Sequence, residues 1–139
     1  MRILVVDDFE PWRRFLCRFL QECPACQVIC EASDGLQAIE KSRELQPDLI
    51  LLDVGLPKLS GIEVARQIRQ VAPGSRILFC SENCCPEVVR EAFNVGGRGY
   101  VVKSDAVHDL LPALDMVMQN RRFVGSRFIG SQFREVVNE

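Results

Sequence analysis

Five short apolar runs alternate with five amphipathic segments along the 139 residues of this chain, and this alternation restricts the folds available to it. The apolar runs are rich in Ile, Leu and Val with little polar alternation, which is typical of strands buried on both faces of a parallel sheet. They lie at 3–7, 27–31, 48–53, 76–81 and 99–102. Apolar residues at helical spacing occupy 11–23, 35–45, 61–72, 86–95 and 105–122. The pattern predicts a doubly wound α/β domain with five parallel strands and five helices.

Composition places the chain among ordinary globular domains, with 47% hydrophobic and 26% charged residues. The net charge of −2 offers no general reason to expect nucleic acid as a partner. The first residues lack the long apolar region of a signal peptide, and no stretch is long enough to span a membrane. We therefore expect a cytoplasmic protein without a membrane partner.

The helical pattern fades after residue 122. We expect one domain over 1–122 and a linker or C-terminal tail over 123–139, which carries Arg127 and Arg134. The tail is too short for a second domain.

Seven cysteines are more than a domain of this size usually carries. Without an export signal, they are interpreted as thiols and not as a disulfide framework. Cys23 and Cys26 have the spacing of half a zinc site or of a redox pair, and Cys17 and Cys30 could complete a zinc site only if their segments converged. The favoured interpretation is inert, partly buried thiols, and it extends to the adjacent pair at 84 and 85.

Polar residues stand where four of the apolar runs end: Asp7 and Asp8, Asp53, Ser81, and Lys103. In an open parallel sheet these ends meet at one edge, where ligands bind. Three close carboxylates repel one another unless a cation lies among them, and oxygen ligands of this kind suit Mg²⁺. Beside such an ion a carboxylate can attack a phosphoryl donor, while the lysine and the hydroxyl can contact phosphoryl oxygens. Each residue alone could instead cap a helix or face solvent, but the coincidence of all of them favours a site.

This set of segments resembles the receiver domain of two-component response regulators over residues 1–122. The matching pieces are 3–8, 48–57, Ser60 with Gly61, Ser81, and 99–103. The resemblance implies the flavodoxin-like, CheY-like fold with strand order 2-1-3-4-5. The string over 99–106 is similar to the branch whose members usually carry a LuxR/NarL-type DNA-binding helix-turn-helix after the receiver.

The resemblance also implies a phosphoryl-accepting switch and not an enzyme in the usual sense. A sensor histidine kinase would pass a phosphoryl group to Asp53. Asp8 and Asp53 would ligate Mg²⁺ through their side chains, Gly55 through its backbone carbonyl, and Asp7 through water.

The resemblance implies that Ser81, Tyr100 and Lys103 respond to phosphorylation of Asp53. Lys103 and Ser81 would contact the phosphoryl group, and Tyr100 would turn inward as the switch operates. The readout surface would be formed by the fourth helix, fifth strand and fifth helix, and would act in homodimerisation or docking. DNA would be contacted only through an output domain absent from this chain, in control of transcription.

Three departures from the family pattern affect the neighbourhood of the site. Ser104 follows the lysine where many receivers have proline, which makes a cis peptide less expected. Glu82 follows Ser81 where a small residue is common. Gly55 and Asn83 occupy positions at which the family tunes its dephosphorylation rate.

Other interpretations remain open. A phosphatase-like enzyme would carry a second acid two residues after Asp53, where this chain has Gly55. A nucleotide-binding flavodoxin-like or Rossmann domain would need a glycine-rich loop after the first strand, where the chain reads Asp8-Phe9-Glu10-Pro11. A stand-alone receiver or a pseudo-receiver would act through docking to another protein alone.

Overall fold

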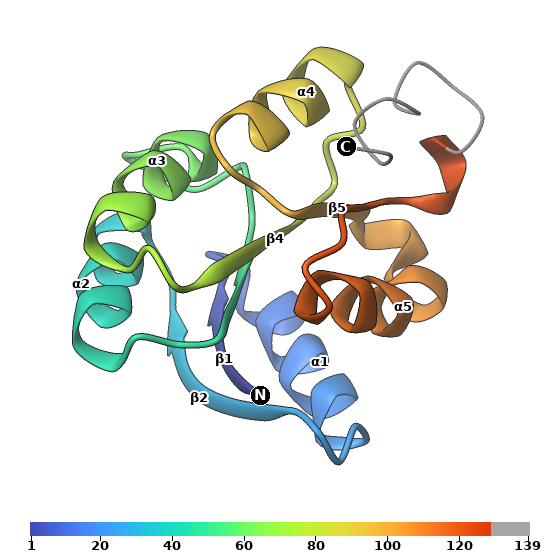
Figure 1. The fold of residues 1–139 in the computed structure, drawn as a ribbon, viewed down its shortest axis with the longest axis horizontal. Helices are drawn as coiled ribbons and strands as arrows, with labels where there is room; N and C mark the ends of the chain where they lie inside the picture. Colours follow the sequence, from blue (N-terminus) through green and yellow to red (C-terminus); the bar gives the residue numbers. More distant parts are fainter. Residues whose placement is uncertain (129–139) are drawn as a thin grey trace.

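The computed structural model describes residues 1–128, which form one parallel sheet covered by helices on both faces (Figure 1). The strands are β1 (Arg2–Val6), β2 (Gln27–Ala32), β3 (Leu49–Leu52), β4 (Arg76–Ser81), β5 (Gly99–Val102) and β6 (Phe123–Val124). The helices are α1 (Glu10–Gln21), α2 (Gly35–Leu45), α3 (Gly61–Val71), α4 (Pro86–Asn94) and α5 (Ala106–Met118), with short 3-10 turns η1 (Lys103–Asp105) and η2 (Ser126–Phe128). The doubly wound fold with five α-helices is therefore confirmed. None of the helices within 1–128 combines the length and the apolar character needed to cross a membrane.

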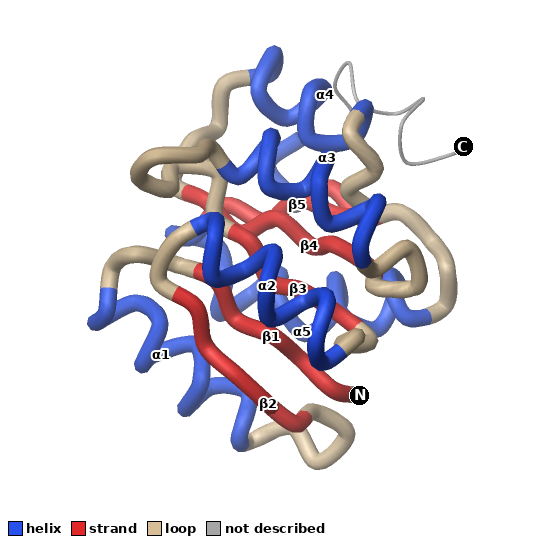
Figure 2. Tube along the Cα trace, turned by 90° about the vertical axis from the view of Figure 1, so that its left-hand side faces the viewer, coloured by secondary structure: helices blue, strands red, loops and turns tan. Residues whose placement is uncertain are grey.

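The sheet has the order β2-β1-β3-β4-β5-β6, and its first five strands follow one another in Figure 2. Its two faces bury separate cores because successive strand residues point to opposite sides. In β1, Leu4 and Val6 join the core under α2, α3 and α4, whereas Ile3 and Val5 join the core under α1 and α5. Burial on both faces explains why these strands read as nearly continuous apolar runs.

Local signals set the starts of the helices that follow the strands. The carboxylate of Asp34 accepts a hydrogen bond from the amide of Gln37 at 2.9 Å, and so caps α2. Pro11 and Pro86 lie in the first turns of α1 and α4, where a missing N–H has no consequence. α5 ends at Met118, earlier than the predicted residue 122, and Asn120 then adopts a left-handed conformation with φ of 61°. That turn redirects the chain toward the sheet.

The prediction of five strands is wrong in number, because β6 adds a sixth. Phe123 and Val124 pair in parallel with Gly99 and Tyr100 of β5. The amide of Gly125 continues the pairing by donating to the Tyr100 carbonyl at 2.9 Å. A strand of two residues is too short to show a pattern in the sequence, so the segment read as the start of a tail.

Residues 123–128, here named the C-terminal strap, are held by side chains as well as by backbone pairing. The carboxylate of Asp109, which is buried, accepts hydrogen bonds from the amide and the hydroxyl of Ser126 at 3.0 and 3.1 Å. Arg127 forms an ion pair with Asp105 at 2.7 Å, and Phe128 is buried in the core under α4. Residues 129–139, with Arg134, lie outside the described part of the chain, so the predicted linker there stays a prediction.

Gly61, at the start of α3, supplies a test of how closely this helix packs against the end of β3. A Cβ at Gly61 would lie 2.0 Å from the backbone oxygen of Asp53 and 2.7 Å from the Cα of Val54. Because backbone atoms cannot rotate away, Gly61→Ala should lower the free energy of unfolding by about 1–3 kcal/mol in urea denaturation. The matched control is Gly74→Ala, since a Cβ at Gly74 meets nothing within 4 Å. Equal stability of the two variants would contradict the observed approach of α3 to the end of β3.

Candidate functional site

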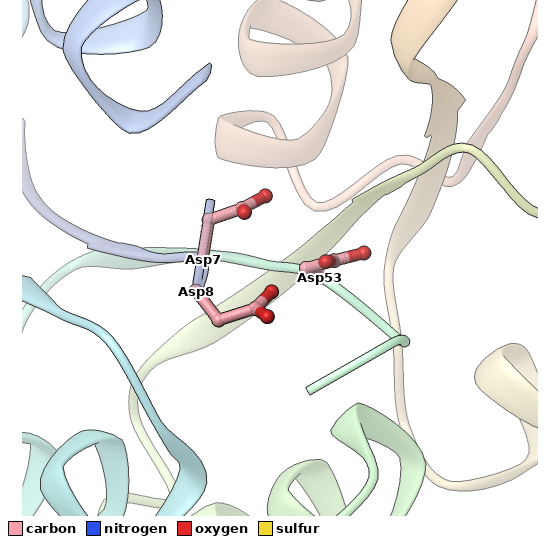
Figure 3. A group of neighbouring side chains, drawn as sticks. All are labelled: Asp7, Asp8 and Asp53. Carbon is pink, nitrogen blue, oxygen red and sulfur yellow. The ribbon is translucent and has the colours of Figure 1, made fainter. Parts of the chain in front are cut away.

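Three aspartates converge at the carboxyl-terminal edge of the sheet. Asp7 and Asp8 follow β1, and Asp53 follows β3, the strand that pairs with β1. The three side chains extend to the same side of the strand ends (Figure 3), and one oxygen from each lies within 4.8 Å of the others. Asp7 and Asp53 are buried, whereas Asp8 is exposed. The adjacent parallel strands thus bring together the acids that the sequence had separated by some 45 residues (Asp8 to Asp53).

Lys103 brings a positive charge to these acids from the end of β5. Its ammonium lies 2.7 Å from Oδ2 of Asp7 and 3.5 Å from Oδ2 of Asp53. The ammonium also lies 5.5 Å from the centre of the Trp12 ring, within range of a cation–π interaction. Only 10% of the lysine side chain is exposed, so its interactions with the acids are weakly screened by water.

The charges of the site do not balance, since one ammonium faces three carboxylates. Burial raises the pKa of Asp7 above its usual value, despite the hydrogen bond from Lys103 that acts in the opposite direction. Burial acts to lower the pKa of Lys103, but the bond to Asp7 and the charge of Asp53 outweigh it and raise that pKa. The excess negative charge makes the site suitable for a cation.

The protein contacts of each carboxylate indicate which oxygens are available to such a cation. Oδ1 of Asp7 accepts the amide of Phe9 at 2.9 Å, while its Oδ2 faces Lys103. Oδ1 of Asp53 accepts the amide of Gly55 at 3.3 Å. Among the described residues, none donates a hydrogen bond to the Asp8 carboxylate. Asp8 and Asp53 could therefore hold a metal, and an all-oxygen donor set suits a hard ion such as Mg²⁺.

Ser81 and Tyr100 lie beside this acidic group and share a neighbour in Asn83. Ser81 is buried at the end of β4, and its hydroxyl accepts the Asn83 amide at 3.2 Å. The hydroxyl of Tyr100 donates to the Asn83 carbonyl at 2.5 Å, from a ring that is fully buried. Burial raises the pKa of Tyr100 to about 12, so the phenol stays neutral and able to donate. The inward position of Tyr100 is thus held by the loop that follows β4.

A cleft of about 430 Å³ opens above Asp53. Asp8, Ser81 and Lys103 line it, and Asp7 lies beneath them. Two of the three departures noted in the sequence lie here too, because the same cleft is lined by Gly55, Glu82 and Asn83, whereas Ser104 lies outside it. These three residues therefore lie in the same cleft as the Asp53 carboxylate.

Two features of the site were missed by the sequence analysis. Trp12 packs over Lys103, and the amide of Phe9 fixes the orientation of Asp7. The only signal was the position of the single tryptophan, in the first turn of the helix that follows the acids. A backbone amide carries no residue-specific signal at all.

The cysteines take no part in the acidic site. Within residues 1–128 the acidic trio is the only cluster with metal-ligand geometry, so Cys17 and Cys30 do not join Cys23 and Cys26 in a zinc site. The sulfurs of Cys23 and Cys26 lie 2.7 Å apart, so a redox role for that pair stays open. The expectation of partly buried thiols is wrong for the pair at 84 and 85, which is exposed in the loop after β4.

Comparison with known proteins agrees with this geometry. The family model of the response regulator receiver domain matches residues 3–115. The response regulator GacA of Pseudomonas viridiflava is 30% identical over 138 residues, which cover 97% of this chain and 61% of GacA. The chemotaxis protein CheY of Bacillus subtilis is 31% identical over 117 residues, covering 84% of this chain and 97% of CheY.

A solved structure extends the likeness to nearly the whole fold. The crystal structure of a LuxR-family two-component response regulator from an Aurantimonas species superposes with a TM-score of 0.90 and 32% identity, covering 98% of this chain and 97% of that one. The chain spans only about three fifths of the length of regulators such as GacA. On the evidence of the matched family model and of the acidic site, this chain belongs to the receiver domains of two-component response regulators, which are phosphoryl-accepting switches.

Proposed function

We propose that Asp53 accepts a phosphoryl group from a sensor histidine kinase and that the resulting change of charge switches an output surface. The observation that carries the proposal is the environment of Asp53. Its carboxylate lines an open cleft between Lys103, at 3.5 Å, and Asp8, whose carboxylate has no protein donor among the described residues. The cleft thus holds a carboxylate that can act as nucleophile, an ammonium group, and a second carboxylate that is available to bind a metal ion.

The residues present fit a bound Mg²⁺. Asp8 and Asp53 would hold it through carboxylate oxygens and Gly55 through its backbone carbonyl, while Asp7 would act through water. Asp7 is suited to an indirect role because both of its oxygens already accept hydrogen bonds, from Phe9 and from Lys103. When bound, the ion neutralises charge on the carboxylates and on the incoming phosphoryl oxygens.

The chemistry of transfer falls to Asp53. An oxygen of its carboxylate attacks phosphorus, the P–N bond of the kinase phosphohistidine breaks, and the electron pair of that bond returns to the imidazole. The Lys103 ammonium is placed to stabilise charge on the transferred oxygens, and the Ser81 hydroxyl can donate to one of them. The Ser81 hydroxyl would then leave its present contact with the Asn83 amide.

In the cell, such a switch would act in the cytoplasm as part of a longer regulator. The likeness to a LuxR-family response regulator supports control of transcription through a DNA-binding domain. Homodimerisation through the face formed by α4, β5 and α5 stays a prediction. The alternative is a stand-alone or pseudo-receiver that works by docking to another protein.

The C-terminal strap offers an output route, that is, a path by which phosphorylation of Asp53 affects the chain that follows the domain. β6 pairs with the strand that carries Tyr100, and Arg127 binds Asp105, two residues beyond Lys103. The Tyr100 carbonyl accepts the Gly125 amide, so the switch residue and the strap are joined directly. Because Tyr100 is already inward with the strap docked, phosphorylation should stabilise this arrangement and carry the signal into the chain beyond residue 128.

Phosphorylation is tested by the intact mass of the protein after incubation with Mg²⁺ and acetyl phosphate. We expect one added phosphoryl group in the wild type, its loss in Asp53→Ala, and its retention in Asp115→Ala, which removes an exposed carboxylate on α5. The gain should also disappear when Mg²⁺ is chelated. If the wild type gains no mass and binds no beryllofluoride, the chain is a pseudo-receiver.

The output route is tested by hydrogen exchange at single amides. Phosphorylation should slow exchange of the Gly125 and Ser126 amides by about fivefold or more, the size of a typical coupling between sites. The amide of Ser75, which bonds to Ala72 at the other end of the sheet, serves as the internal control. Unchanged exchange in the strap, in a sample shown by mass to be phosphorylated, would remove the strap from the output route and leave phosphorylation itself intact.

A further inference from the structure

A second cleft lies at the opposite end of the sheet from Asp53. It has a volume of about 450 Å³ and forms where the chain enters β4 and β5. Four arginines line it: Arg69 at the end of α3, Arg76 at the start of β4, Arg98 just before β5, and Arg122 after α5. None of the described residues that line this arginine cleft is acidic. Such a gathering of one sign of charge in a concave site focuses a positive potential within it.

Three of these arginines form no ion pair with any residue of the described part of the chain. The ion pairs described within residues 1–128 engage other arginines, such as Arg13 with Glu31 and Arg66 with Glu63, but none of Arg69, Arg76 or Arg98. Within residues 1–128, these three cleft arginines therefore have no carboxylate partner, unlike Arg13 and Arg66. The sequence analysis had assigned these residues no role.

Two of the guanidinium groups are held in place without losing their charge. Arg76 donates from Nε to the side-chain oxygen of Asn120 at 3.0 Å, and Arg98 donates from Nη2 to the backbone oxygen of Asn120 at 3.0 Å. Asn120 itself sits in a left-handed turn. A neutral amide residue therefore orients two cations and leaves further N–H groups on each of them for a ligand. Fixing these side chains beforehand lowers the entropic cost of binding.

The side chain of Arg69, which also lines the cleft, lies against the backbone of Gly96. A Cβ at Gly96 would lie 2.4 Å from Cδ and 2.7 Å from Nε of Arg69, and the residue has φ of +104°. Only glycine therefore lets the turn after α4 adopt this backbone and lets the arginine lie against it. No hydrogen bond engages the Arg69 guanidinium within the described chain, so all of its donors are available.

We propose that the arginine cleft binds the phosphate groups of a small, nucleotide-sized anion. Planar guanidinium groups match phosphate oxygens through paired N–H bonds, and several together favour a multiply charged ligand. The volume falls in the range of small-molecule sites and exceeds what one phosphate fills. Nucleic acid is disfavoured because it needs an extended basic surface, whereas this charge is confined to one cleft on a chain of net charge −2. The site is remote from Asp53, so it stands independently of the proposed phosphorylation.

The test is isothermal titration calorimetry of the full chain in EDTA, which keeps Mg²⁺ from joining phosphate to the acidic site. The probes are ADP, inorganic pyrophosphate and adenosine. We expect ADP and pyrophosphate to bind, adenosine to fail, and Arg69→Gln to weaken binding about tenfold, as the loss of a charge-assisted hydrogen bond implies. Tighter binding of ADP than of pyrophosphate would identify a nucleotide, and equal binding a simple polyphosphate.

The matched control is Arg43→Gln, which removes an exposed arginine of α2 with the same change in net charge. Arg69 makes no described hydrogen bond, so its replacement should leave the fold intact, and urea denaturation of the variant checks this. The proposal is overturned if the wild type binds neither ADP nor pyrophosphate at millimolar concentration. It is also overturned if Arg43→Gln weakens binding as much as Arg69→Gln, or if only a DNA duplex binds in an Arg69-dependent way.

Discussion

The ammonium of Lys103 contacts carboxylates that belong to two other strands, Asp7 at 2.7 Å and Asp53 at 3.5 Å. This one side chain joins the end of β5 to the ends of β1 and β3, across β4, in a setting where little water screens the charges. It also leaves the site with more negative than positive charge, because Asp8 has no cation of its own among the described residues. The excess of negative charge among Asp7, Asp8 and Asp53 follows from this arrangement.

The sequence predicted the acidic site well because the rule it used is geometric. Parallel strands that end in Asp7, Asp53 and Lys103 must bring those residues to one edge, whatever the details of packing. Side chains fixed by backbone groups could not be foreseen: the bond from Tyr100 to the Asn83 carbonyl depends on the course of a loop. The sixth strand was missed for a related reason, since two residues show no periodicity and β6 is defined by its partner β5. The arginine cleft likewise arises from loops that are far apart in the sequence.

β5 links the three functional features of the molecule. Arg98 precedes this strand and lines the arginine cleft, Tyr100 lies within it, and Lys103 follows it in the acidic site. The C-terminal strap pairs along the same strand. Both clefts are thus lined by residues at the two ends of this four-residue strand.

The described residues of the acidic site leave negative charge uncompensated, and a divalent cation would relieve it. The most direct measurement compares urea denaturation with Mg²⁺ and with EDTA for the wild type and for Asp8→Ala. We expect Mg²⁺ to stabilise the wild type, as any ligand of the native state does, and Asp8→Ala to lose this gain while being more stable than the wild type in EDTA. Stability of the wild type that is the same in both buffers, or an Asp8→Ala variant that keeps the full response to Mg²⁺, would contradict this expectation.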